Sequence, residues 1–158
     1  MPSVLFVCTA NQCRSPMAEA IFRDLMQKNG KLEAWSIDSA GVGALAGQPA
    51  TLFTQSTLRE RGIEIGAHRS RTVTKELLRS HKLILTMEHE QEEALKSAFP
   101  EMTDRICLLA SMVDGQFDID DPIGRPIERY RSLANELTDV LERGLPRIEW
   151  LAADPASG

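Results

Sequence analysis

The sequence has few cysteines, few aromatic residues and no long apolar run, and each shortage excludes a class of protein. Its three cysteines are an odd number and follow no basic leader with an apolar segment, so a secreted disulfide framework is not expected. No stretch approaches the roughly 18 apolar residues of a transmembrane helix. The sequence therefore predicts a cytoplasmic protein with reduced thiols and no membrane association.

Positive charge is also scarce. Eighteen lysines and arginines stand against 23 acidic residues, for a formal net charge of −5, which argues against a general nucleic-acid binder. The three histidines show no metal-ligand spacing with one another or with the cysteines, so no metal is expected. Residues 41–46, "GVGALA", fit part of a dinucleotide fingerprint, but Gly47 and Pro49 prevent the helix that it must open. The prediction is therefore a protein without a cofactor.

Apolar, strand-like runs alternate with helical patterns along the chain. The runs cover residues 4–7, 34–38, 82–87 and 105–109, and the helical patterns cover residues 16–28, 49–61, 74–80, 88–99 and 130–143. This alternation, in a chain that is 42% hydrophobic, predicts a single doubly wound α/β domain over residues 1–150. Its four-stranded parallel sheet would carry helices on both faces. Gly144 is the expected end of the last helix, Cys107 is expected to be a buried structural thiol, and residues 151–158 form a predicted tail.

The first strand leads directly into a candidate phosphate-binding loop. Val4–Val7 is followed by Cys8, five loop residues and Arg14, and Ser15 and Pro16 suit the N-cap and first position of a helix. Unpaired N–H groups at a helix start bind oxyanions, and an arginine adds two parallel charged hydrogen bonds. The same field favours a thiolate, which would be placed for in-line attack on phosphorus. The candidate loop residues are Thr9, Ala10, Asn11, Gln12 and Cys13.

Cleavage of a phosphate ester also needs an acid that protonates the leaving group. The candidate lies in "DIDDPIG", on a loop after the fourth strand and at the same edge of the sheet as Cys8. Asp121 precedes Pro122, which restricts its backbone and can fix the direction of its carboxyl group. Asp118 and Asp120 are the alternatives.

Residues 4–22, "VLFVCTANQCRSPMAEAIF", resemble the N-terminal signature of the low-molecular-weight protein tyrosine phosphatases. Similar segments are "DSAGVGALAGQPA", "AHRSRTVT", "KLILTMEHE" and "DPIGRPIERY", so the resemblance covers nearly the whole chain. It implies a flavodoxin-like fold and a phosphorylated protein substrate, in a monomer or weak dimer. The roles that it implies are a nucleophile at Cys8, a phosphate clamp at Arg14, a general acid at Asp121, loop shaping by Asn11, thiolate stabilisation by Ser15, and support of the loop or site by His68 and Glu88.

The substrate is less well defined, because two segments depart from the family pattern. "GVGALAG" and "PIGRP" lack the aromatic residues that usually line a phosphotyrosine slot, and Gln12 replaces a branched aliphatic residue. The related protein-arginine phosphatases carry a threonine at that position and begin the loop with Cys-Thr, as Cys8 and Thr9 do. The resemblance to the family predicts phosphotyrosine as the substrate, and these departures make phosphoarginine the alternative.

Two other functions use the same loop. Thiol-coupled arsenate reduction needs a pair of relay cysteines after the third strand, and residues 86–97 contain none. A non-catalytic phosphate-binding module has no need for a thiol, a guanidinium and an acid together. Both are therefore weaker predictions than a phosphatase.

Overall fold

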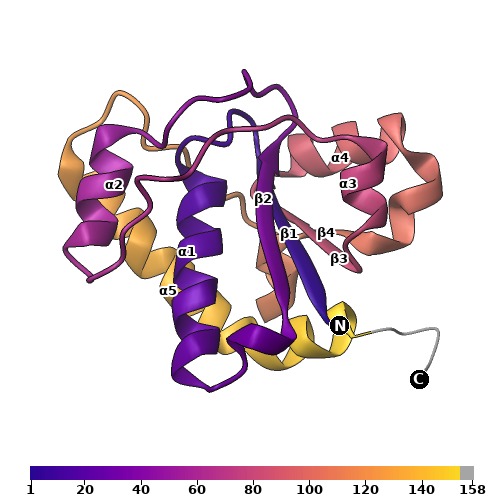
Figure 1. The fold of residues 1–158 in the computed structure, drawn as a ribbon. Helices are drawn as coiled ribbons and strands as arrows, with labels where there is room; N and C mark the ends of the chain where they lie inside the picture. Colours follow the sequence, from indigo (N-terminus) through magenta and orange to yellow (C-terminus); the bar gives the residue numbers. More distant parts are fainter. Residues whose placement is uncertain (154–158) are drawn as a thin grey trace.

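A central parallel sheet organises the protein, whose computed structural model describes residues 1–153. Its strands are β1 (Ser3–Cys8), β2 (Ser36–Gly41), β3 (Leu83–Thr86) and β4 (Ile106–Leu108), in the spatial order β2-β1-β3-β4 (Figure 1). All pairings are parallel, and β1, buried along its whole length, lies between β2 and β3. The predicted four-stranded α/β sheet is confirmed.

Helices cover both faces of this sheet. They are α1 (Arg14–Lys28), α2 (Leu52–Arg59), α3 (Lys75–Arg79), α4 (His89–Ala98) and α5 (Ile127–Ala152), with 3-10 turns at Leu32–Ala34, Pro100–Arg105 and Leu109–Val113. Because side chains alternate along a strand, Val4 and Phe6 join the core beneath α1 and α5. Leu5 and Val7 join the second core beneath α3 and α4. Within residues 1–153, no helix is long and apolar enough to cross a membrane.

The predicted end of the last helix is wrong. Gly144 does not end α5, which continues to Ala152 with Pro146 in its interior. Gly144 instead lets α5 pack closely, since a Cβ atom there would lie 2.8 Å from Cβ of Met112. Ile148 and Ala152 are buried in the final turns, and that burial holds the helix together beyond the proline. Leu151 and Ala152, part of the predicted tail, thus belong to α5, and residues 154–158 of that tail lie outside the described residues.

The start of the first helix also differs from the prediction. Cys13, not Ser15, occupies the N-cap position, and α1 begins at Arg14. This shift by two residues places Arg14 and Ser15 in the first helical turn, so the serine hydroxyl is not used as a cap. The helix predicted over residues 49–61 is shorter, because the side chain of Thr51 caps α2 by accepting a hydrogen bond from the Thr54 N–H.

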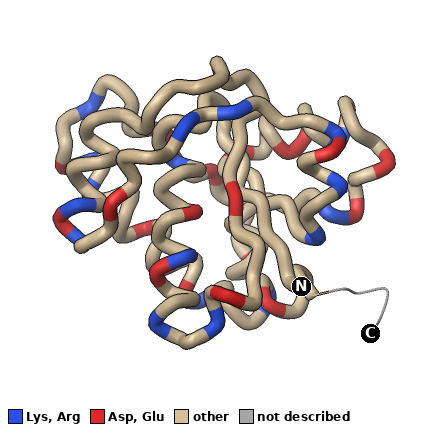
Figure 2. The backbone as a smooth tube through the Cα atoms, viewed as in Figure 1, with Lys and Arg blue, Asp and Glu red and all other residues tan. Residues whose placement is uncertain are grey.

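Acidic and basic residues are interspersed over the fold rather than gathered on one side (Figure 2). Many lie in ion pairs between exposed side chains, such as Arg131 with Glu60 at 2.7 Å and Arg59 with Glu64 at 3.0 Å. Such exposed pairs add little to stability, because water and salt screen their charges. Over residues 1–153, the charge pattern gives no sign of an extended basic surface.

Candidate active site

The candidate phosphate-binding loop lies between the end of β1 and the start of α1. A cavity above it is lined by Cys8, Ala10, Gln12, Cys13, Arg14, Asp121 and Ile123. The structure thus brings the predicted nucleophile, clamp and acid together, although Asp121 is more than 100 residues from Cys8 in the chain. Parallel strands that end at one edge of the sheet explain this convergence.

The segment that follows β2 fixes the outer side of this loop. The N–H groups of Val42 and Gly43 each donate a 3.0 Å hydrogen bond, to the carbonyls of Cys8 and Thr9 respectively. Gly41 permits this close approach, because a Cβ atom there would lie 2.4 Å from the carbonyl oxygen of Thr9. With these carbonyls bound on the outer side, the loop can turn its N–H groups toward an anion.

The Cys8 sulfur has two polar neighbours. The backbone N–H of Asn11 donates to it at 3.3 Å, and Oγ of Ser15 lies 3.0 Å away. Ser15 already accepts a hydrogen bond from Nδ2 of Asn11 at 2.8 Å, which leaves its proton for the sulfur or for the carbonyl of Ala40 at 3.3 Å. Both groups can donate to the sulfur, as the role of nucleophile predicted for Cys8 requires. The implied role of Ser15 as a donor to the thiolate agrees with this geometry.

Asn11 shapes the loop through both its backbone and its side chain. Its φ of +57° lies in the left-handed region, which costs a non-glycine residue about 1 kcal/mol or more. The buried side chain offsets this cost, since Nδ2 also donates to Oγ of Ser39 at 3.0 Å and Oδ1 accepts from the N–H of Arg71 at 3.0 Å. The carbonyl of Asn11 lies 2.8 Å from Nε2 of His68, which is the supporting contact implied for that histidine.

Arg14 is buried, and one of its nitrogens fixes its orientation. Nη1 donates to Oε2 of Glu88 at 2.5 Å and to the carbonyl of Ile119 at 2.7 Å. Nη1 makes both hydrogen bonds, so the Nε–H and Nη2–H groups can face an anion as a two-pronged donor. Glu88 therefore acts on the site by holding the guanidinium.

Asp121 is the acidic residue that lies beside the loop. Its Oδ2 is 3.7 Å from Nη2 of Arg14, and its Oδ1 accepts a hydrogen bond from the N–H of Ile123 at 3.1 Å. Asp118 is used elsewhere, because its Oδ1 accepts from the backbone N–H of His89 at 2.9 Å and lies 2.8 Å from Nδ1 of that residue. These contacts, chiefly the backbone one, lower the pKa of Asp118. Asp118 therefore anchors the start of α4.

Asp120, the other alternative acid, faces a neighbouring groove. That groove is lined by both Asp120 and Asp121 together with Arg125, Arg129 and Glu136. Burial, with a smaller contribution from Asp120, raises the pKa of Glu136. Since Asp121 is the only one of the three aspartates that lines the cavity at Cys8, it remains the candidate acid.

Sequence reasoning missed Gln91, which connects the loop to α4. Its Oε1 accepts 3.0 Å hydrogen bonds from the N–H groups of Met87 and Glu88, and its Nε2 donates to Oγ1 of Thr9 at 3.1 Å. Gln91 lies three residues after the Glu88 N-cap, and the two form a reciprocal capping box. The pattern of a glutamate followed by a glutamine three residues later could have identified it as a cap, but not as a contact of Thr9.

The other two cysteines differ from Cys8 in their surroundings. Cys13 is almost fully buried, and that burial, only partly opposed by a hydrogen bond with Thr54, raises its pKa to about 12. Burial also raises the pKa of Cys107, which lies on β4 and is only partly buried against the core, not fully buried as predicted. Both therefore stay in the thiol form near neutral pH.

Peroxide should convert Cys8 and Cys13 into a disulfide. Peroxide first oxidises the Cys8 sulfur to a sulfenic acid, releasing one water, and the Cys13 thiol then condenses with it, releasing a second. Intact mass should show the loss of two hydrogens, and dithiothreitol should restore activity. Cys13→Ser should instead be inactivated irreversibly, whereas Cys107→Ser should behave like the unmodified protein. Irreversible loss in the unmodified protein would contradict the protective role of Cys13.

Comparison with known proteins places this site in a family. Residues 3–151 match the model of the low molecular weight phosphotyrosine protein phosphatases. A protein-arginine-phosphatase of Geobacillus stearothermophilus is 39% identical over 147 residues, covering 92% of this chain and 95% of the relative. A probable low molecular weight protein-tyrosine-phosphatase, EpsP of Ralstonia nicotianae, is 34% identical over 149 residues, covering 94% and 97%.

The fold agrees with that assignment. A solved structure of the YwlE arginine phosphatase, described as a cysteine-to-serine mutant with a phosphorylated active-site serine, superposes with a TM-score of 0.88. It is 33% identical and covers 99% of both chains. By sequence, by the extent of the match and by fold, the chain belongs to the low-molecular-weight phosphotyrosine protein phosphatase family.

Proposed function

We propose that this protein removes phosphate from phosphorylated protein side chains by two successive displacements at Cys8. The observation that carries the proposal is the cavity above the loop, which the Cys8 thiol, the Arg14 guanidinium and the Asp121 carboxyl group line together. A thiolate, a two-pronged cation and an acid are the groups that phosphoryl transfer through cysteine requires.

In the first displacement, loop N–H groups and Arg14 bind the phosphate oxygens. The Cys8 sulfur attacks phosphorus, so a sulfur–phosphorus bond forms while the bond to the leaving oxygen or nitrogen breaks. Asp121, in its protonated form, gives its proton to that leaving group. Arg14 does not reorient during this step, because Glu88 and the carbonyl of Ile119 hold its Nη1.

In the second displacement, water attacks the phosphocysteine. Asp121, now a carboxylate, accepts a proton from the water, and the phosphorus–sulfur bond breaks to release phosphate and the Cys8 thiolate. The Asn11 N–H and the Ser15 hydroxyl stabilise the returning negative charge on sulfur. The related arginine phosphatase with a phosphorylated serine at its active site supports a phosphorylated nucleophile in this family.

Phosphotyrosine is the proposed substrate. Ile123 lines the cavity and is 53% exposed, so its side chain offers an apolar wall to a phenyl ring. Phosphoarginine is the second candidate, because Gln12 also lines the cavity and its amide can hydrogen-bond a guanidinium. A relative named as an arginine phosphatase and one named as a probable tyrosine phosphatase match this chain at similar identity.

The direct test compares kcat/KM for phosphotyrosine and phosphoarginine in peptides of otherwise identical sequence, on one protein preparation. We expect both to be hydrolysed, with a higher value for phosphotyrosine. A higher kcat/KM for phosphoarginine would make it the preferred substrate in place of phosphotyrosine. Failure to hydrolyse either peptide, or an aryl phosphate, would contradict the proposed function itself.

Gln12→Ile should shift selectivity toward phosphotyrosine. The substitution removes an amide that can bind a guanidinium and adds apolar surface beside the ring, so we expect the ratio of the two kcat/KM values to change by about tenfold, or 1.4 kcal/mol. Gln48→Ile, outside the residues that line the cavity, is the control and should leave the ratio unchanged. An unchanged ratio in Gln12→Ile, or a shift toward phosphoarginine, would show that this position does not select the substrate.

A further inference from the structure

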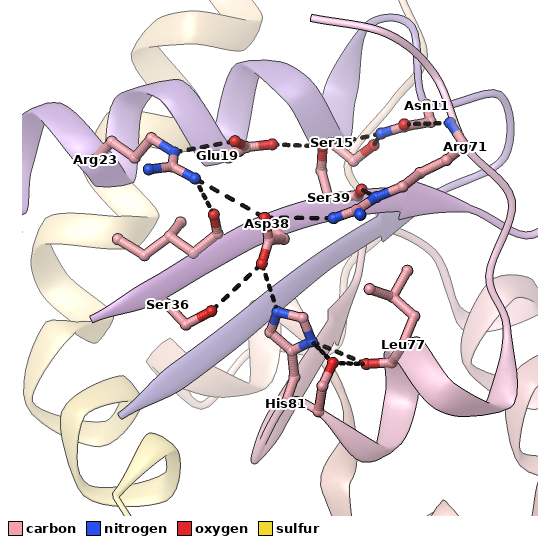
Figure 3. Close-up of polar contacts among 12 residues, drawn as sticks. Asn11, Ser15, Glu19, Arg23, Ser36, Asp38, Ser39, Arg71, Leu77 and His81 are labelled. Carbon is pink, nitrogen blue, oxygen red and sulfur yellow. Dashed lines mark hydrogen bonds and ion pairs between the residues drawn. The ribbon is translucent and has the colours of Figure 1, made fainter. Parts of the chain in front are cut away.

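A closed ring of polar contacts joins Asn11 of the candidate phosphate-binding loop to α1, β2 and the segment that precedes α3 (Figure 3). Its members are Asp38, Arg71, Asn11, Ser39, Glu19 and Arg23. We propose that Asp38, held in place by His81, is a positioning residue for this loop. The proposal rests on the proposed function, because its consequence is the reactivity of Cys8.

The first arm of the ring runs through Arg71. Oδ1 of Asp38 lies 3.3 Å from Nη2 of Arg71, whose Nε donates to the carbonyl of Ser39 at 3.1 Å. The backbone N–H of Arg71 donates to Oδ1 of Asn11 at 3.0 Å. Two contacts of its side chain thus fix the place at which the Arg71 backbone meets the Asn11 amide.

The second arm runs along α1. Arg23 lies 3.9 Å from Oδ1 of Asp38 through Nη2, and its Nε donates to Oε2 of Glu19 at 3.0 Å. The other oxygen of Glu19 accepts a 2.7 Å hydrogen bond from Oγ of Ser39, which itself accepts from Nδ2 of Asn11. The two arms therefore end on opposite sides of one amide, at Oδ1 and at Nδ2, and together they fix its orientation.

His81 holds the carboxylate from which both arms start. It is 2% exposed, its Nε2 lies 2.8 Å from Oδ2 of Asp38, and its Nδ1 lies 2.9 Å from the carbonyl of Leu77 and 3.1 Å from Oγ of Ser80. This contact uses the carboxylate oxygen that the two arginines do not use, so Asp38 cannot rotate without breaking it. The hydrogen bond from His81 is also the main reason why the pKa of Asp38 is lowered.

Asn11 connects the ring to the Cys8 thiol through its backbone and its side chain. The amide held by the ring donates to Ser15, and the backbone of the same residue, strained at a φ of +57°, directs its N–H at the Cys8 sulfur. Asp38 is not among the residues that line the cavity at Cys8, so it acts through the residues of the ring, of which Asn11 contacts the sulfur. Arg71 and Arg23 are about half exposed, which makes the charge attraction to Asp38 weak. The expected contribution is therefore geometric.

The test is Asp38→Asn, which keeps the size of the side chain and removes its charge. Asp24→Asn is the matched control, because Asp24 is also paired, with Lys28 at 2.8 Å, and its side chain is 34% exposed against 33% for Asp38. Two quantities would be measured for each variant: kcat and KM for an aryl phosphate, and the rate at which iodoacetamide alkylates Cys8 as a function of pH.

For Asp38→Asn we expect kcat to fall about tenfold with little change in KM. An amide has one acceptor oxygen where the carboxylate has two, so the contact with His81 or those with the arginines are lost and Asn11 is held less firmly. The pH midpoint of Cys8 alkylation should rise, while Asp24→Asn leaves both quantities unchanged. Asp38→Glu should restore part of the loss. Should Asp38→Asn not fold, Arg71→Lys should show the same pair of changes, because one ammonium replaces the separate Nε and Nη2 donors that reach the Ser39 carbonyl and Asp38.

An unchanged alkylation profile in Asp38→Asn would overturn the proposal, as would an equal loss in Asp24→Asn. Alkylation needs no turnover, so it tests the ring separately from the proposed function. If the unmodified protein hydrolysed no phosphate ester, the proposed function would fail, and a raised alkylation midpoint in Asp38→Asn would still support the ring.

Discussion

Cys8→Ser should abolish turnover and leave anion binding intact. The hydroxyl is a far weaker nucleophile than a thiolate, and loss of a covalent catalyst typically costs a thousandfold or more, on the order of 10³–10⁶ in kcat. Binding should survive because Arg14 is held by Glu88 and Ile119, not by Cys8. The measurements are kcat with an aryl phosphate and the dissociation constant for inorganic phosphate or vanadate.

Cys107→Ser is the control for that experiment, since Cys107 lies on β4 outside the residues that line the cavity. It should retain full activity. Residual activity in Cys8→Ser above about one part in a thousand would remove Cys8 as the nucleophile. Loss of phosphate binding in the same variant would instead show that the thiol is needed to keep the loop in its binding conformation.

Asp121→Asn should slow substrates with poor leaving groups far more than activated ones. Phenyl phosphate requires a proton on its leaving oxygen, whereas para-nitrophenyl phosphate requires little, so the loss for phenyl phosphate should reach about 10²–10⁴-fold. The ratio of the two kcat/KM values in each variant measures this difference directly. Phosphoarginine, whose leaving nitrogen must also be protonated, should behave like phenyl phosphate.

Asp118→Asn is the matched control for general-acid loss. Asp118 is bound to His89 at the start of α4, so its substitution should affect stability more than leaving-group dependence. Equal losses for both substrates in Asp121→Asn would show that Asp121 acts structurally. A leaving-group effect seen only in Asp118→Asn would show that Asp118, and not Asp121, is the general acid.

The catalytic constellation could be predicted from the sequence because its members stand at the ends of strands. Cys8 and Arg14 are separated by one loop, and Asp121 follows the last strand, so the rule that strand ends converge in a parallel sheet brings all three together. The same rule does not assign a precise helix start. Ser15 and Pro16 fit a capping pattern, yet the helix begins at Arg14. The Ser15 hydroxyl lies beside the Cys8 sulfur and does not cap the helix.

The residues that hold the loop from below could not be predicted in this way. Asp38, Arg71 and His81 come from three separate segments, and their meeting depends on the pairing of β2 with β1 and on the path of the chain before α3. Each is an ordinary charged or polar residue in the sequence. Gly144 shows the same limit: the pattern of a helix end was present, but packing against Met112 decided its role.

Capture of the covalent intermediate tests the central claim most directly. Asp121→Asn should transfer phosphate from para-nitrophenyl phosphate to the thiol and then hydrolyse the intermediate slowly, because no carboxylate accepts a proton from the attacking water. Acid quenching during turnover, followed by peptide mass spectrometry, locates the phosphate. We expect one phosphoryl group on Cys8. Turnover with phosphate on another residue, or with none on the protein at any quench time, would contradict the proposed mechanism.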